Sequence, residues 1–95
     1  MPKAYWIAHV TVTDAERYKV YAEGTAAPFA TYGAKVLARG GAYQALEGAD
    51  HARNVVIEFP DMETALSCYN SPEYQAAREH RLGAGIANIT IVEGI

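Results

Sequence analysis

The strand-to-helix transition at residues 4–18 reads AYWIAHVTVTDAERY. Residues 4–12 are rich in β-branched and aromatic side chains and contain neither Gly nor Pro, which predicts a β-strand. Its two faces carry Trp6, Ala8, Val10 and Val12 on one side, and Tyr5, Ile7, His9 and Thr11 on the other. Both faces are largely apolar, so we expect this strand to be covered on both sides.

A helix is predicted directly after this strand. Residues 13–16 read TDAE, the pattern of a capping box in which the Thr13 hydroxyl accepts from the backbone N–H of Glu16 and the Glu16 side chain returns the bond. Gly24 and Pro28 interrupt the helical pattern, which predicts a kink or two segments. Gly33 is expected to end it in a left-handed conformation.

The same strand and helix patterns recur along the rest of the chain. Strands are predicted at residues 35–39, 53–59 and 88–93. The first of these patterns continues over residues 42–46, beyond a glycine pair at 40–41 that indicates a bulge or a close backbone approach. A short helix is predicted from Asp61, and a second one follows Ser71, a good N-cap with Pro72 at the first helical position.

The resulting order is βαββαβ in a single domain, residues 1–95. Two right-handed crossovers in one sheet predict an α+β, ferredoxin-like fold with an antiparallel sheet of order 4-1-3-2 and two helices on one face. The other sheet face is too apolar to stay in water, so we expect a homodimer of the dimeric α/β-barrel type.

Composition narrows the classes of function. The formal charge is −3, which argues against a nucleic-acid partner. No apolar run approaches the ~20 residues of a membrane helix, and no signal peptide is expected because a strand pattern begins almost at once. The single cysteine, Cys68, reads as a small buried hydrophobe. These features predict a cytoplasmic protein.

Polar residues on otherwise apolar strands are the first candidates for a site. A turn centred near residues 48–49 would place Arg39 opposite Glu58. One interpretation is a cross-strand ion pair. The other is a pocket in which Arg39 binds an anionic or carbonyl substrate and Glu58 acts as a base with a raised pKa. His9 is the second candidate for proton transfer.

Several tyrosines and Arg81, near the end of the second predicted crossover, are further candidates for the site. The chain has seven tyrosines, and several fall on helix faces turned toward the sheet, where they build either a bulky core or a ligand cavity lined by phenols. Arg81 would need a partner if buried, and Glu58 is the natural candidate. If both arginines reach Glu58, that carboxylate stays ionised and is a poor base. No metal-ligand spacing and no cofactor motif is found, so neither is predicted.

Three runs resemble the domain-of-unknown-function family 1330. They are Arg39-Gly40-Gly41, the run from Arg53 to Pro60 (RNVVIEFP) and the run from Cys68 to Gln75 (CYNSPEYQ). The resemblance covers nearly the whole chain and implies a ferredoxin-like dimeric α/β barrel in small cytoplasmic bacterial proteins. Related barrels include cofactor-independent monooxygenases, haem-degrading enzymes and muconolactone isomerase-like enzymes, which place a ligand between helices and sheet.

The leading hypothesis is therefore a homodimer that binds a small anionic or aromatic metabolite between helices and sheet, with or without cofactor-independent chemistry. The predicted ligand-binding residues are Arg39, Glu58, Tyr69, Tyr74 and Arg81, with Glu58 and His9 as candidate catalytic residues. The alternative is a structural or binding homodimer in which the arginines and Glu58 form an internal salt-bridge network. A third hypothesis, haem degradation through His80, lacks a second ligand at matching spacing.

Overall fold

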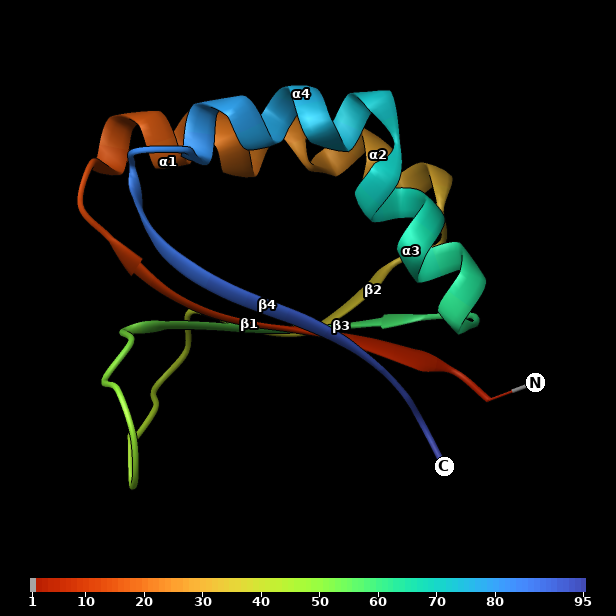
Figure 1. Ribbon diagram of the computed structural model, residues 1–95, viewed down its shortest axis with the longest axis horizontal. Helices are drawn as coiled ribbons and strands as arrows, with labels where there is room; N and C mark the ends of the chain where they lie inside the picture. The colour runs from red at the N-terminus through yellow and green to blue at the C-terminus, as the bar shows by residue number, and fades with distance from the viewer. Residues whose placement is uncertain (1) are drawn as a thin grey trace.

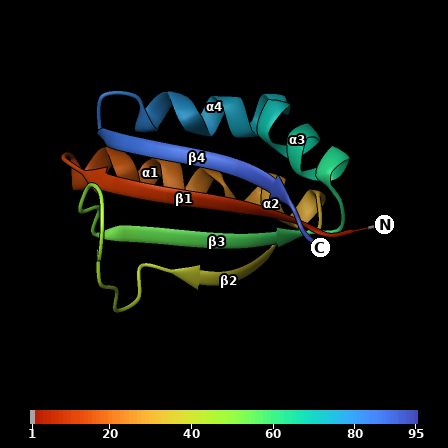
Figure 2. The same ribbon diagram turned by 60° about the horizontal axis from the view of Figure 1, so that its bottom comes forward.

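A computed structural model describes residues 2–95 of the chain. Its strands form one antiparallel sheet in the order β2-β3-β1-β4, and helices cover one face of it (Figure 1). The strands are β1 (Ala4–Val12), β2 (Lys35–Arg39), β3 (Arg53–Phe59) and β4 (Gly85–Glu93). Figure 2 shows them side by side, with β1 and β3 in the centre. The predicted fold and sheet order are confirmed.

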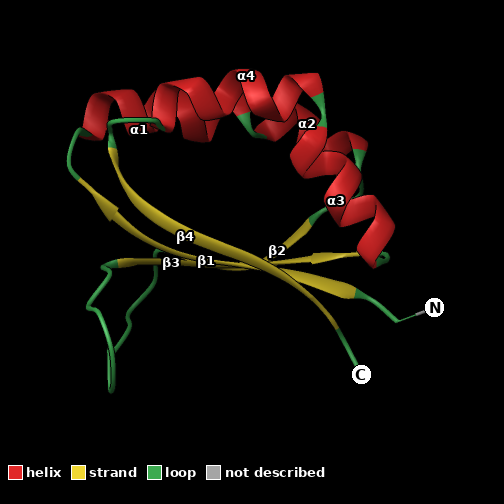
Figure 3. Ribbon diagram, viewed as in Figure 1, coloured by secondary structure: helices red, strands yellow, loops and turns green. Residues whose placement is uncertain are grey.

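Each crossover contains two helical segments (Figure 3). The sequence predicted a kink or two segments in the first crossover and two helices in the second, although the predicted fold class counted only one helix for each crossover. The segments are α1 (Ala15–Gly24), α2 (Ala26–Thr31), α3 (Met62–Asn70) and α4 (Pro72–Arg81). The first break falls at Thr25, which ends α1 and precedes α2. The second falls at Ser71, whose side chain accepts from the backbone N–H of Tyr74 as predicted for an N-cap.

The predicted capping box at residues 13–16 is wrong in detail. Asp14 is the N-cap of α1, and its carboxylate accepts from the backbone N–H of Arg17 at 3.2 Å. The backbone N–H groups of Thr13 and Asp14 both donate to the carbonyl of Ala84. Thr13 is therefore hydrogen-bonded to the segment that precedes β4 and does not cap the helix, which begins after Asp14.

An aromatic cluster joins the helices to the sheet. Trp6 of β1 is 1% exposed, and its ring packs against Phe29 at 5.5 Å, Tyr74 at 5.0 Å and Phe59 at 6.0 Å between centroids. These pairs bring together α2, α4, β1 and β3. The apolar face predicted for β1 therefore packs against the helices.

The opposite face of the sheet carries no helix in the described part of the chain (Figure 1). The segment at residues 40–52, between β2 and β3, extends from this side of the sheet. We call it the open face; its residues include Tyr5, Ile7, His9, Val56, Glu58, Ile86, Asn88 and Val92. No helix within residues 2–95 is long and apolar enough to cross a membrane.

The predicted pairing of Arg39 with Glu58 is wrong. Arg39 lies opposite Val55, while Glu58 lies opposite Lys35. The register differs because residues 42–46 form no strand and a bulge lies between Val36 and Ala38. Side chains alternate between the faces of a sheet, so three residues along β3 place Glu58 on the face opposite to Val55. Arg39 faces the helices and Glu58 does not.

Candidate functional site

A cavity of about 420 Å³ lies between the helices α1 and α2 and the strands β1, β2 and β3. We call it the helix–sheet cavity. Its apolar wall includes Trp6, Ala8, Phe29, Val55 and Ile57, and its polar lining includes Tyr18, Tyr21, Thr25, Arg39, Arg53 and Arg81. None of the described residues that line it is acidic. The cavity therefore combines apolar walls with three positive charges.

Arg81 is the most deeply placed of these charges. It lies in the last turn of α4 and is 8% exposed, with its guanidinium carbon 5.2 Å from the centre of the Tyr21 ring. Its Nε is buried and has no hydrogen-bond partner within residues 2–95. A buried cation without an anionic partner is costly, and stacking on an aromatic face compensates only part of that cost. Arg81 thus lacks the carboxylate that the sequence led us to expect.

Arg53 forms a second stack beside the first. Its Nε donates to the Tyr18 hydroxyl at 3.2 Å, and its guanidinium carbon lies 5.2 Å from the Tyr18 ring centre. The Tyr18 and Tyr21 rings are themselves 5.2 Å apart. Gly40 permits this placement, because a Cβ there would lie 3.2 Å from an Arg53 nitrogen. Two neighbouring tyrosines of α1 therefore each carry one guanidinium.

Arg39 supplies the third charge from the last residue of β2. It is exposed, in contrast to Arg81, and so lies where the helix–sheet cavity meets solvent. Arg39 and Arg81 therefore both line the helix–sheet cavity, and a contact of either with a ligand stays a prediction.

Tyr74 lies behind the cavity wall. It is fully buried, and its hydroxyl is 2.8 Å from that of Tyr21, which does line the cavity. Burial raises the pKa of both phenols above the usual value for tyrosine. Both hydroxyls therefore stay protonated at neutral pH. Tyr74 holds Tyr21 in place, and its predicted contact with a ligand stays untested.

Tyr69, a predicted ligand-binding residue, does not line the helix–sheet cavity. Its half-buried ring lies 5.2 Å from Tyr74 and lines a smaller cavity between α4 and β4. Cys68, beside it in α3, is fully buried, and burial raises the pKa of its thiol to about 11. The thiol therefore remains protonated, in line with the small hydrophobe expected from the sequence.

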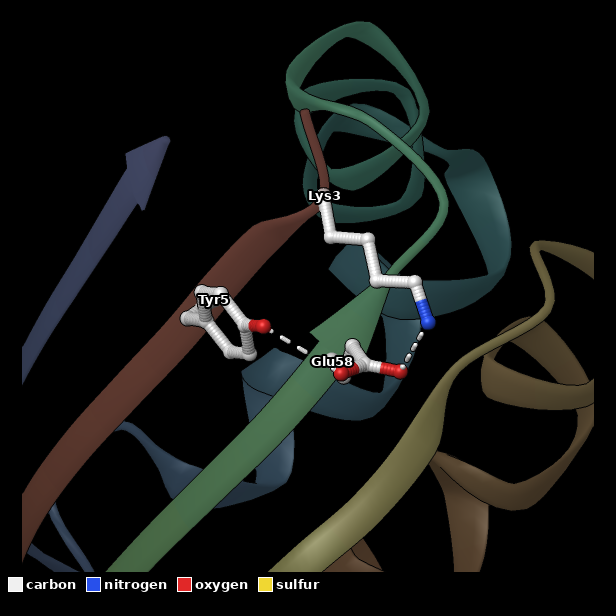
Figure 4. A network of polar contacts seen from close by, with 3 residues as sticks. All are labelled: Lys3, Tyr5 and Glu58. Atoms are coloured by element: carbon white, nitrogen blue, oxygen red, sulfur yellow. Dashed lines mark hydrogen bonds and ion pairs between the residues drawn. The ribbon is translucent and has the colours of Figure 1, made fainter. Parts of the chain in front are cut away.

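Glu58 lies on the open face, away from the helix–sheet cavity. Its carboxylate accepts from the Lys3 ammonium at 3.1 Å and from the Tyr5 hydroxyl at 3.3 Å (Figure 4). The bond from Lys3 is the main reason that the pKa of Glu58 lies below its usual value. The hypothesis of a base with a raised pKa beside Arg39 is therefore wrong in both place and charge state.

This ion pair predicts how stability depends on pH. A carboxyl whose pKa is lowered by folding stabilises the protein above its unfolded pKa of about 4.5, and the contribution is lost as pH falls through the folded pKa. Glu58→Gln should lower Tm slightly at neutral pH and leave it unchanged in strong acid. The difference should not exceed a few degrees, because Lys3 is 59% exposed. Thermal melts at several pH values measure it; a gap that widens in acid would contradict the assignment.

His9 also lies on the open face. Its Nδ1 is 2.7 Å from Oδ1 of Asn54, and it lines a hollow with His51 and Asn88 beside the segment at residues 40–52. The sheet separates this hollow from the three arginines. Neither candidate catalytic residue therefore reaches the helix–sheet cavity, and any role for His9 belongs to the open face.

Sequence reasoning missed the stack of Arg53 on Tyr18. The signal was present, because Arg53 alternates with Val55, Ile57 and Phe59 and so shares their face of β3. Glu58, the candidate that the sequence indicated on this strand, occupies the other face. The strand period alone identifies Arg53 as the charge that faces the core.

Several solved structures share this fold. A protein of unknown function from Rhodopseudomonas palustris, RPA0582, superposes with a TM-score of 0.80 at 18% identity, covering 99% of this chain and 83% of that one. SnoaB, a cofactor-independent oxygenase from Streptomyces nogalater, gives 0.64 at 16% identity, covering 100% and 95%. A dimeric ferredoxin-like protein of unknown function from Thermobifida fusca gives 0.65 at 12% identity, covering 98% and 92%.

Comparison by sequence gives the family. No curated protein matches this chain significantly. The sequence profile of the domain of unknown function DUF1330 matches residues 3–95, which is nearly the entire chain. The helix–sheet cavity and its three arginines are thus features of a protein that belongs to the DUF1330 family.

Proposed function

We propose that this protein binds a small anionic metabolite with an aromatic or other apolar body in the helix–sheet cavity. The observation that carries the proposal is Arg81, a buried guanidinium with an unpartnered Nε in a cavity without acidic lining residues. A carboxylate or similar anion would supply the missing partner through charge-assisted hydrogen bonds. The apolar wall around Trp6 would cover the rest of the ligand, and about 420 Å³ lies within the range of small-molecule sites.

The alternative of an internal salt-bridge network has no support in the geometry. The only ion pair within 4.0 Å among residues 2–95 joins Lys3 to Glu58 on the open face. Arg39, Arg53 and Arg81 therefore hold no carboxylate of their own chain at that distance. A purely structural role would leave Arg53 and Arg81 with aromatic rings and the Tyr18 hydroxyl, but no carboxylate, to compensate their charges.

Binding is favoured over acid–base catalysis by the chemistry of the lining. Among the described lining residues there is no His, Asp or Glu, and the pKa of the Tyr21 phenol is raised. These groups donate hydrogen bonds and offer no proton acceptor at neutral pH. SnoaB, described as a cofactor-independent oxygenase, shares the fold. Any comparable chemistry here would have to start from a ligand that binds already ionised.

Trp6 provides a direct test, because it is the chain's single tryptophan and lines the cavity. A panel of small aromatic carboxylates, each paired with its neutral amide, should be titrated while tryptophan fluorescence is followed. We expect a saturable change with at least one carboxylate and none with its amide. Equal responses to both members of every pair, or no saturable response at all, would overturn the proposal.

We also propose that two copies of the chain pack through their open faces in a cytoplasmic homodimer. Ile86 and Val92 of β4 are 61% and 46% exposed on this face, and Ile7 of β1 and Val56 of β3 are half-buried on the same face. An apolar surface of this kind is typical of an interface. The description of the Thermobifida fusca structure as dimeric supports a dimeric state. Cys68, a free buried thiol, is compatible with a reducing compartment.

A further inference from the structure

The cavity between α4 and β4 is separate from the helix–sheet cavity. It has a volume of about 350 Å³ and is lined by Arg78, Arg81, Gly83 and Tyr69, among others. Arg81 lines both cavities, whereas Arg78 lines only this one and Arg53 only the other. The two cavities therefore share Arg81 and Ile89 as lining residues, and each also has at least one arginine that the other lacks.

Two unpartnered nitrogen atoms distinguish this cavity. The Nε atoms of Arg78 and Arg81 are the buried side-chain polar atoms without a hydrogen-bond partner in the described part of the chain. Both residues line the α4–β4 cavity, and Arg81 is more than nine-tenths buried. Unpartnered buried donors are rare in folded proteins, because each costs much of its hydration energy. Both atoms belong to arginines that line this cavity, whereas only one of these two arginines lines the helix–sheet cavity. The paired guanidinium groups without a carboxylate partner indicate an absent anion.

Capping of the α4 C-terminus does not account for these arginines. Carbonyl groups at a helix end attract cations, and both arginines lie in the last turn. However, the carbonyl of Arg78 accepts from Leu82, that of Arg81 from Ala84, and that of Leu82 from the Arg17 side chain at 2.8 Å. These three carbonyls are therefore already satisfied, and no capping bond from the guanidinium groups of Arg78 and Arg81 is formed within residues 2–95.

Arg17 adds a third positive charge at the rim. A nitrogen of its guanidinium lies 3.2 Å from the position that a Cβ at Gly83 would occupy. Gly83 has a φ of +82° and no side chain, so this wall of the cavity is formed by backbone. No carboxylate within residues 2–95 lies within 4.0 Å of a charged nitrogen of these arginines.

We propose that the α4–β4 cavity is a second binding site, specific for a compact oxyanion that Arg78 and Arg81 hold together. The chemistry is that of a phosphate or a similar tetrahedral or planar oxyanion, which arginine recognises through paired N–H donors. The anion is either a free ion or the charged group of a larger molecule. The site does not require the helix–sheet cavity to bind anything.

Inorganic phosphate is the probe for the test, added at constant ionic strength against a chloride reference. NMR shifts of the Gly83 and Gly85 amides should change saturably. Arg78→Gln should weaken this binding by at least about tenfold, since a hydrogen bond between charged groups is lost. Arg53→Gln should leave it unchanged, because Arg53 does not line this cavity. A linear, non-saturating shift, or equal affinity in Arg78→Gln, would overturn the proposal.

A second arm distinguishes the source of the anion. Phenyl phosphate should shift the same glycine amides if the oxyanion belongs to a larger ligand, and inorganic phosphate alone should do so if the ion is free. Trp6 fluorescence reports the helix–sheet cavity independently in the same samples. If the aromatic carboxylates produce no change in Trp6 fluorescence while phosphate still shifts the glycine amides, the proposed function is rejected and the second site is supported.

Discussion

Arg81→Gln is expected to reduce the affinity for an aromatic carboxylate by at least about tenfold, the effect of losing one charge-assisted hydrogen bond. The substitution removes the one buried guanidinium of the helix–sheet cavity and retains a side chain of similar reach. The measurement is the same titration followed by Trp6 fluorescence. Arg78→Gln is the matched control, because it removes an arginine from the same helix that does not line this cavity.

The melting temperature of the free variant separates a binding role from a structural one. In the free protein the buried charge of Arg81 lacks an anionic partner, so its removal should leave Tm unchanged or raise it. If Arg81 were structural, the same substitution would lower Tm. Weaker binding with an unchanged Tm supports the account, whereas unchanged binding or a marked loss of stability contradicts it.

Ile7→Asp should convert the proposed homodimer into a monomer. A two-fold interface carries each substitution twice, so two carboxylates would be placed against an apolar surface. We expect the dissociation constant to rise by at least about a hundredfold, since like charges across an interface cost several kcal/mol. Sedimentation equilibrium measures it, with circular dichroism to check the fold.

Val20→Asp is the control for this substitution. Val20 lies on α1, on the other side of the molecule, and is 47% exposed. The carboxylate there should leave the assembly unchanged. Ile86→Asp provides a second variant on the open face at a position that is already 61% exposed, so its fold is not at risk. A wild-type chain that sediments as a monomer at micromolar concentration would contradict the interface.

The fold followed from local signals that act over short distances. The alternation in β1, the N-cap at Ser71 and the left-handed Gly33, with φ of +70°, are each set by neighbouring residues. They fix the order of the elements, and the crossover rule then leaves one sheet arrangement. The start of α1 moved by one residue because Ala84, distant in sequence, binds the backbone of Thr13 and Asp14.

The candidate site followed only in part, because it depends on register. Arg39 and Arg81 were predicted in one ligand pocket together with Glu58; the two arginines line the helix–sheet cavity, and their role in binding stays a prediction. Glu58 was placed with them by assuming a symmetric hairpin, but the bulge after Val36 and the irregular segment before β3 shift the pairing by an odd number of residues. A shift by an odd number of residues pairs Arg39 with side chains of the other face of β3, so Glu58, the candidate base, lies outside the site. The register between β2 and β3 depends on residues distant in sequence, so no local sequence pattern predicts it.

The central claim is that the helix–sheet cavity holds an anion against Arg81. A crystal structure of the protein with the tightest-binding aromatic carboxylate of the panel tests it most directly. The account predicts electron density for the ligand between α1, α2 and the sheet, with its carboxylate within hydrogen-bond distance of the Arg81 guanidinium and its ring against Trp6. A cavity closed by side chains, with Arg81 bonded to acceptors of its own chain, would contradict the account.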